Sequence, residues 1–158
     1  TMASAVQLKF LHAMFEAATE AGHVWPAAAA CESCDEAAWG KSDLYLEGNN
    51  VFGSKTPAHP LYPSITLPTR EFEHGKWITL GHQDFVHYPD VAASFRDRMA
   101  TLVRLAPSRP HYAAALAAKS AEEFLMEVSQ TWSTNPKRAA ECISILHAHP
   151  ECLVTRKD

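Results

Sequence analysis

The carboxylate of Glu36 stands in a sequence context suited to acid chemistry. It ends an alanine-rich stretch that follows Pro26, and Gly40 comes four residues later. Because proline fits the first turn of a helix, alanine has the highest helix propensity and glycine commonly ends helices, we expect a helix over 26–40. Glu36 would lie in its last turn, where the negative end of the helix dipole and the apolar residues 37–39 disfavour a charged carboxylate. A carboxylic acid that stays protonated near neutral pH is what a general acid requires.

A second pair of carboxylates, Glu71 and Glu73, lies among residues that favour β-structure. Such residues cluster around Phe72 and over 77–80, and His74-Gly75 between them is typical of a hairpin turn. Side chains alternate along a strand, so both carboxylates should point to one side and Phe72 to the other. The sequence therefore predicts a β-hairpin with acidic groups on one face.

The elements that must position these carboxylates form one domain. The chain has 158 residues, 47% of them hydrophobic, which suffices for a single core over 1–158. Prolines at 57, 60, 63 and 68 and the predicted hairpin set off a small β-lobe over 56–83. Apolar spacing and caps predict further helices that begin near Ser4, Ser42, Pro89, Tyr112, Ser120 and Asn135-Pro136. The fold class is thus α+β and mainly helical.

The charge of the chain narrows the choice of partners. A net charge of −4 argues against nucleic acid and anionic membrane, which require a basic surface. Nine histidines, with a reference pKa of roughly 6.5, would turn the charge positive in mild acid and strengthen binding to an anionic polymer. The chain contains no apolar run long enough for a membrane span and no export leader, so we expect no membrane insertion.

Five segments of the chain resemble, in order, the motifs of a known family. Residues 36–42 read EAAWGKS and residues 49–55 read NNVFGSK, similar to the E-S-G-W-G-K-S and N-N-L-F-G-x-K motifs of the bacterial glucosaminidases, glycoside hydrolase family 73. The other three segments are TREFE at 69–73, YPD at 88–90 with SFRD at 94–97, and WSTNP at 132–136. The resemblance implies a lysozyme-like fold, in which a helical lobe and a small β-hairpin lobe form a cleft, and it implies hydrolysis of peptidoglycan.

The sequence departs from the family pattern at two places. The Ser-Gly pair after the acid is Ala37-Ala38 here, and the late Tyr is Trp132. Glu32-Ser33 also resembles the family's E-S pair, but aligning it there would demand an insertion, whereas Glu36 matches without a gap. Glu32, one turn before Glu36, is instead expected on an exposed or paired helix face.

The resemblance assigns roles to individual residues. Glu36 would be the general acid, and the family's T-x-E pattern selects Glu71 as the second carboxylate. Sugars present apolar faces and hydroxyl groups, so aromatic and amide side chains are expected to bind them. The expected substrate contacts are Tyr88, Trp132, Glu73, Asn50 and Trp77. Two of these have an alternative role, since Trp132 also suits core packing and Asn50 suits a turn after the preceding helix.

The predicted activity is that of an endo-β-N-acetylglucosaminidase. An N-acetylmuramidase remains an alternative, because the same cleft can cut the other linkage if the subsites shift by one sugar. A catalytically weak module that only binds peptidoglycan is a further alternative. A retaining, inverting or substrate-assisted mechanism is equally compatible with the sequence. We expect a monomer that acts on the cell wall, in the periplasm or outside the cell, with phage-endolysin-type release as one route.

Four cysteines leave the redox state of the chain open. Cys31 and Cys34 with His147, His149 and Cys152 contain the residue types of a zinc site. The family resemblance supplies no metal and no cofactor, so neither is expected. A Cys142–Cys152 disulfide and buried free thiols remain as alternatives.

Overall fold

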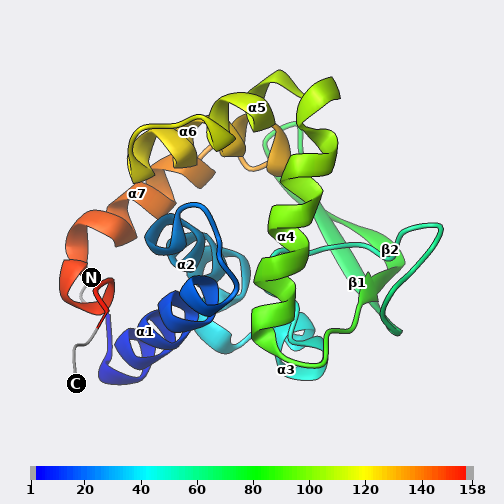
Figure 1. Ribbon diagram of the computed structural model, residues 1–158. Coiled ribbons are helices and arrows are strands. Elements are labelled where there is room, and N and C mark those ends of the chain that lie inside the picture. Colours follow the sequence, from blue (N-terminus) through cyan, green and yellow to red (C-terminus); the bar gives the residue numbers. More distant parts are fainter. Residues whose placement is uncertain (1–2, 156–158) are drawn as a thin grey trace.

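The computed structural model describes residues 3–155, which form seven α-helices and one antiparallel β-hairpin. The helices are α1 (Ala5–Glu20), α2 (Pro26–Glu36), α3 (Asp43–Gly48), α4 (Val91–Leu105), α5 (Pro110–Leu116), α6 (Ala121–Trp132) and α7 (Arg138–Ala148). The strands are β1 (Ser64–Glu73) and β2 (Lys76–Val86). In Figure 1 the hairpin projects on one side of α4, and α1, α2, α6 and α7 lie on the other. The predicted mainly helical α+β fold is confirmed, and no helix within residues 3–155 is long and apolar enough to cross a membrane.

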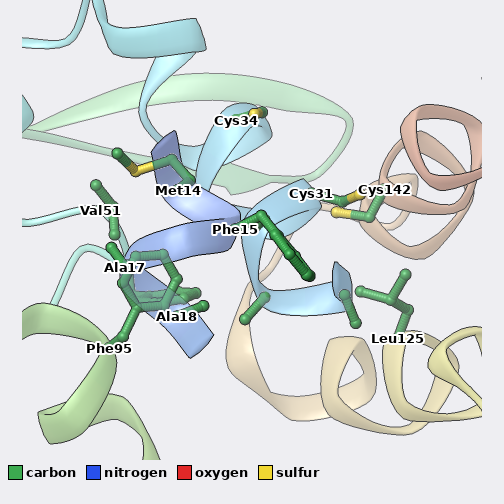
Figure 2. Packing of buried hydrophobic residues seen from close by; sticks show 14 of the residues in the cluster. Met14, Phe15, Ala17, Ala18, Cys31, Cys34, Val51, Phe95, Leu125 and Cys142 are labelled. Carbon is green, nitrogen blue, oxygen red and sulfur yellow. The ribbon is translucent and has the colours of Figure 1, made fainter. Parts of the chain in front are cut away.

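The core forms where α1 and α2 pack against each other. Alanines at 28, 29 and 30 are fully buried, as are Leu11 and Ala18 on α1. Because alanine side chains are small, the two helices can approach closely and bury these apolar groups. Figure 2 shows Met14 and Phe15 of α1 within the same cluster, which also takes in residues of α4, α6 and α7. This core fixes the position of α2, the helix that ends at Glu36.

The cysteines belong to this core. In Figure 2 the sulfur atoms of Cys31 on α2 and Cys142 on α7 point toward each other, and the two helices are in contact. No disulfide joins Cys142 to Cys152 within the described residues, so that alternative is not realised in this structure. Among residues 3–155, no three His, Cys, Asp or Glu side chains gather into a metal site, and the zinc grouping considered from the sequence is not assembled.

Local signals for helix starts hold at some positions and fail at others. Ser4 forms the predicted capping box with Gln7, and Ser120 caps α6 by accepting a hydrogen bond from the Glu123 N–H at 3.1 Å. The helix expected at Pro89 begins at Val91 instead, because Asp90 is its N-cap and accepts from Ala93 N–H at 2.8 Å.

The predicted helix over 26–40 is too long at its C-terminal end. α2 stops at Glu36, and Ala38 and Trp39 take left-handed backbone angles, with φ of 49° and 56°. The carbonyl of Ala37 then accepts hydrogen bonds from the N–H groups of Gly40, Lys41 and Ser42 at 3.0–3.1 Å. A tight turn replaces the last helical turn, and Glu36 becomes the final residue of α2.

The hairpin has the predicted turn. His74 and Gly75 both have positive φ, 51° and 78°, as the two central residues of a tight hairpin turn require. Strand β2 extends to Val86, beyond the predicted limit of the β-lobe at 83, because its last residues still pair with β1 and Val86 lies opposite Ser64. Pro68 lies inside β1 next to a register shift, where a missing N–H is tolerated.

Candidate active site

A cleft of about 1070 Å³ opens between the helices and the hairpin. The helical wall includes Glu36 from the end of α2 and Ser42 before α3. The hairpin wall includes Glu71 and Trp77, and Trp132 from the end of α6 also lines the cleft. The structure therefore brings four of the seven predicted site residues to one cavity.

Glu36 is held at the cleft wall by a cation from a distant part of the chain. Its side chain is 24% exposed, and Arg138 Nε donates to Glu36 Oε1 at 2.8 Å. Arg138 is the first residue of α7, and 102 positions separate the two residues. The sequence argument considered only the helix dipole and the apolar neighbours of Glu36, and it missed this ion pair.

Behind Arg138 lies a buried pair of charges. Glu32 and Arg98 are both fully buried, and Arg98 donates from Nη1 and Nη2 to the two Glu32 oxygens at 2.9 and 2.6 Å. Burial alone would raise the pKa of Glu32, but the guanidinium groups of Arg98 and Arg138 outweigh it and lower this pKa to about 2. Of the two settings expected for Glu32, exposed or paired, the structure shows a paired and wholly buried one.

Arg98 is also enclosed by aromatic rings. Its guanidinium carbon lies 4.4 Å from the ring centre of Phe52, 4.3 Å from that of Trp132 and 5.6 Å from that of Phe124. Cation–π attraction of this kind is strengthened where water is excluded. The indole N–H of Trp132 donates to the Phe52 carbonyl at 3.3 Å. Trp132 thus has both roles considered from the sequence, since it packs on the buried cation and lines the cleft.

Asp35 stands directly before Glu36 and carries a shifted pKa. Burial, a hydrogen bond with Glu141 and the charge of Glu141 raise the pKa of Asp35 to about 7. The Asn135 side-chain amide donates to Glu141 at 3.3 Å. A second carboxyl group that exchanges its proton near neutral pH therefore lies next to Glu36, and nothing in the local sequence indicated it.

Glu71 is supported by contacts from two other motif segments. Glu71 Oε1 lies 3.6 Å from Lys55 Nζ, and Thr134 Oγ1 donates to Glu71 Oε2 at 3.3 Å. The same Thr134 oxygen accepts from the Phe72 N–H at 3.1 Å, which ties the hairpin to the segment after α6. Three of the five motif segments therefore meet at this carboxylate.

Trp77 presents an aromatic face on the hairpin wall. It is 51% exposed and lines the cleft. Phe72 packs edge-on against it with ring centres 5.2 Å apart, and the Arg70 guanidinium lies 6.0 Å from its ring centre. Sequence reasoning did not foresee Arg70, which also lines the cleft.

Three of the expected substrate contacts, Tyr88, Asn50 and Glu73, are not among the residues that line the cleft. Tyr88 is fully buried, and its hydroxyl donates to Asp97. Asn50 is also buried, and its amide nitrogen donates to the carbonyls of Ser54 and Val86 at 3.0 and 2.9 Å. Glu73 lies opposite Lys76 at the exposed end of the hairpin. The first two hold the loop and strand beneath the cleft, and a contact of any of the three with substrate stays a prediction.

The turn role considered for Asn50 is present in the structure, and the neighbouring Asn49 shares it. Asn49 is the C-cap of α3 and takes a left-handed conformation with φ of 51°. Its side-chain amide donates to the Tyr88 carbonyl at 3.0 Å. The NNVFGSK segment therefore fixes the backbone between α3 and the hairpin, and its last residue, Lys55, reaches Glu71.

A helical lobe and a β-hairpin that face each other across a cleft, with a carboxylate on each wall, define a lysozyme-like glycoside hydrolase. The profile described as mannosyl-glycoprotein endo-beta-N-acetylglucosaminidase matches residues 12–150. The chain therefore belongs to the glucosaminidase family.

Solved structures share this fold. A peptidoglycan hydrolase mutant from Sphingomonas sp. A1 is 18% identical with a TM-score of 0.76, over 92% of this chain and 97% of that one. The catalytic domain of the autolysin Auto from Listeria monocytogenes is 22% identical with a TM-score of 0.74, over 97% and 89%. A C-terminally truncated glycoside hydrolase domain of FlgJ from Salmonella typhimurium is 22% identical with a TM-score of 0.70, over 92% and 98%. A comparison with curated protein sequences gave no match.

Proposed function

We propose that Glu36 and Glu71 are the catalytic carboxylates with which this glucosaminidase cleaves the glycan backbone of peptidoglycan, as an endo-β-N-acetylglucosaminidase. The observation that carries the proposal is that the two side chains line one cleft from its helical and its hairpin wall. Hydrolysis of a glycosidic bond needs an acid on one side of the bond and a stabilising or attacking group on the other. A glycan strand in this cleft would lie between two such groups.

Each carboxylate has a distinct step in this scheme. Glu36 gives its proton to the oxygen of the leaving sugar, and the bond from that oxygen to the anomeric carbon breaks. Glu71 stabilises the positive charge that develops on the ring, or orients the water or N-acetyl group that attacks it. The Lys55 and Thr134 contacts support this role because they fix the Glu71 side chain before substrate binds.

The two tryptophans supply surfaces for the sugar rings. Trp77 offers a half-exposed face on the hairpin wall, and Trp132 lines the cleft on the helical side. The apolar faces of N-acetylated sugars pack well on such rings. The names of the structural neighbours, two of which are peptidoglycan hydrolases or autolysins, support peptidoglycan as the polymer. We further propose that the protein works as a monomer at the cell wall, in the periplasm or outside the cell.

The test is digestion of purified peptidoglycan, followed by borohydride reduction and mass spectrometry of the new reducing ends. Wild type should release reduced N-acetylglucosamine ends, and Glu36→Gln and Glu71→Gln should each lower turnover by roughly 100-fold or more. Glu73→Gln is the matched control, because Glu73 lies on the same strand as Glu71 but away from the cleft. It should keep wild-type turnover.

Other outcomes would overturn specific parts of the proposal. Reduced muramic acid ends would identify a muramidase. Binding without new ends would identify a module that only holds peptidoglycan. An equal loss of turnover in Glu71→Gln and Glu73→Gln would remove the assignment of Glu71.

A further inference from the structure

Arg138 occupies a place that is unfavourable for a cation. It is 1% exposed and is the first residue of α7, where the partial charge of the helix end is positive. Lys137 before it provides no side-chain cap. A buried cation at a helix N-terminus costs folding free energy, and residues that break local rules in this way tend to serve a site.

The hydrogen bonds that Glu32 accepts come from Arg98 and not from Arg138. Arg98 already donates to both oxygens of Glu32, at 2.9 and 2.6 Å. Arg138 Nη2 lies 2.6 Å from Glu32 Oε2, but its direction does not make a hydrogen bond. Glu32 thus attracts the Arg138 guanidinium through its negative charge, but it does not accept a hydrogen bond from Nη2.

The other nitrogens of Arg138 define its orientation. Nη1 donates to Ser129 Oγ at 3.0 Å, and Nε donates to Glu36 Oε1 at 2.8 Å. The guanidinium is planar and rigid, so fixing two of its nitrogens fixes the third. Of the residues that contact the Arg138 guanidinium, Glu36 is the one that lines the cleft.

We propose that Arg138 is the positioning residue for Glu36: it fixes the orientation of that carboxyl group at the cleft wall and stabilises the negative charge that appears when Glu36 releases its proton. This inference rests on the proposed role of Glu36 as general acid. When the proton passes to the leaving oxygen, Glu36 becomes a carboxylate, and the Arg138 cation is already in place beside it. The charged and titratable groups that face Arg138 are Glu32, Asp35 and Glu36 on α2, Tyr112 on α5 and Cys142 on α7.

The experiment compares Arg138→Gln, Arg138→Lys and the matched control Arg98→Lys. Arg98 belongs to the same buried network but contacts Glu32 and not Glu36. Turnover of peptidoglycan is measured per folded molecule across pH, together with binding to insoluble peptidoglycan and thermal unfolding. Arg138→Gln should lower kcat by roughly 100-fold with little change in binding, because an orienting and charge-stabilising donor is lost.

The pH profile distinguishes positioning from folding. The alkaline limb of kcat should move to higher pH in Arg138→Gln, because an acid releases its proton less readily once a neighbouring cation is removed. Arg138→Lys, which keeps the charge, should restore the position of that limb and part of kcat. Arg98→Lys should lower the unfolding temperature and leave the limb in place.

Several results would overturn the inference. A folded Arg138→Gln with the kcat and pH profile of wild type would overturn it. An alkaline limb that shifts equally in Arg98→Lys and Arg138→Gln would also overturn it. If Arg138→Gln does not fold, a folded Arg138→Lys with unchanged kcat and profile overturns it alone. An active Glu36→Gln would show that Glu36 is not the general acid, which is a failure of the proposed function. The Arg138 variants do not test that assignment.

Discussion

The two walls of the cleft support their carboxylates in different ways. On the helical wall, Glu36 ends a buried helix and pairs with Arg138, which is itself backed by buried charges. On the hairpin wall, Glu71 lies on a two-stranded sheet and meets one half-exposed lysine and one hydroxyl. Breaking a buried charge network is costly, whereas exposed pairs contribute little. The core therefore fixes one carboxylate, and surface contacts hold the other.

The difference follows from where each wall gains its stability. A two-stranded hairpin is marginal by itself and depends on what it docks against. In Figure 1 the hairpin stands apart from the helices that form the core. Its links include the bridge between Lys55 and Phe85 near its base and the Thr134 contacts near Glu71. The hairpin wall therefore depends on contacts at its base and near Glu71, whereas the helical wall is part of the core.

The largest expected effect breaks the buried network. Glu32→Ala would leave Arg98 buried without its partner, and we expect the free energy of unfolding to fall by about 3–5 kcal/mol. Lys55→Ala, which removes the exposed cation beside Glu71, should cost about 1 kcal/mol or less. Urea unfolding followed by circular dichroism measures both values. Equal losses in the two variants would contradict the contrast between the walls.

The next effect concerns the pH dependence of the helical wall. The pKa of Asp35 rises from 3.8 to about 7 on folding, mainly through burial and then through Glu141. The folded state therefore holds this proton more tightly than the unfolded chain, so the stabilisation is complete below pH 3.8 and is lost as the pH rises through 7. The urea concentration at the unfolding midpoint of wild type should decrease when the pH is raised from about 4 to about 8. Asp35→Asn should make this decrease smaller.

Glu32 provides the contrast in sign. Its pKa is lowered from 4.5 to about 2, so its stabilisation is present above pH 4.5 and is lost as the pH falls through 2. Asp35→Asn should therefore leave acid unfolding near pH 2 unchanged, because Glu32 is intact in this variant. Asp43→Asn, at an exposed position, is the control and should keep the pH dependence of wild type. If the urea midpoint of Asp35→Asn changes with pH as steeply as that of wild type, a group other than Asp35 causes the pH dependence.

The smallest effect sharpens the comparison at the hairpin. Thr134→Val keeps the shape of the side chain but removes the hydroxyl that accepts from the Phe72 N–H. We expect amide exchange at Phe72 to speed up about fivefold, as the loss of a hydrogen bond worth roughly 1 kcal/mol implies. Thr131→Val, an exposed cleft residue on α6, is the control. Unchanged exchange in Thr134→Val would mean that other contacts hold the hairpin.

Features set by neighbouring residues could be predicted from the sequence. The Ser4 capping box and the His74-Gly75 turn depend on a few consecutive residues, and both are present. Glu36, Glu71 and Trp132 could be placed at one cleft because their motif segments stand at fixed places in the family fold. Trp77 lies outside those segments and was expected at the cleft only as an aromatic residue suited to sugar binding. The limit of this reasoning shows at Tyr88, where an aromatic residue of a motif packs in the interior rather than at the cleft.

Features set by distant residues could not be predicted. The partners of Glu32 and Glu36 come from 66 and 102 positions away, and no local pattern connects them. The start of α7 shows the same limit. Asn135-Pro136 looked like a cap and first turn, but Asn135 Oδ1 accepts from the Lys137 N–H at 3.0 Å, and the helix begins only at Arg138.

The left-handed turn after Glu36 also affects how many further substitutions this protein can tolerate. The family motif has glycine where this chain has Ala38, and Ala38 keeps a positive φ of 49°. A side chain in that conformation costs about 1 kcal/mol, which glycine avoids. Alanine here therefore leaves a smaller margin of stability than glycine would, and a smaller margin lets a protein absorb fewer destabilising substitutions elsewhere.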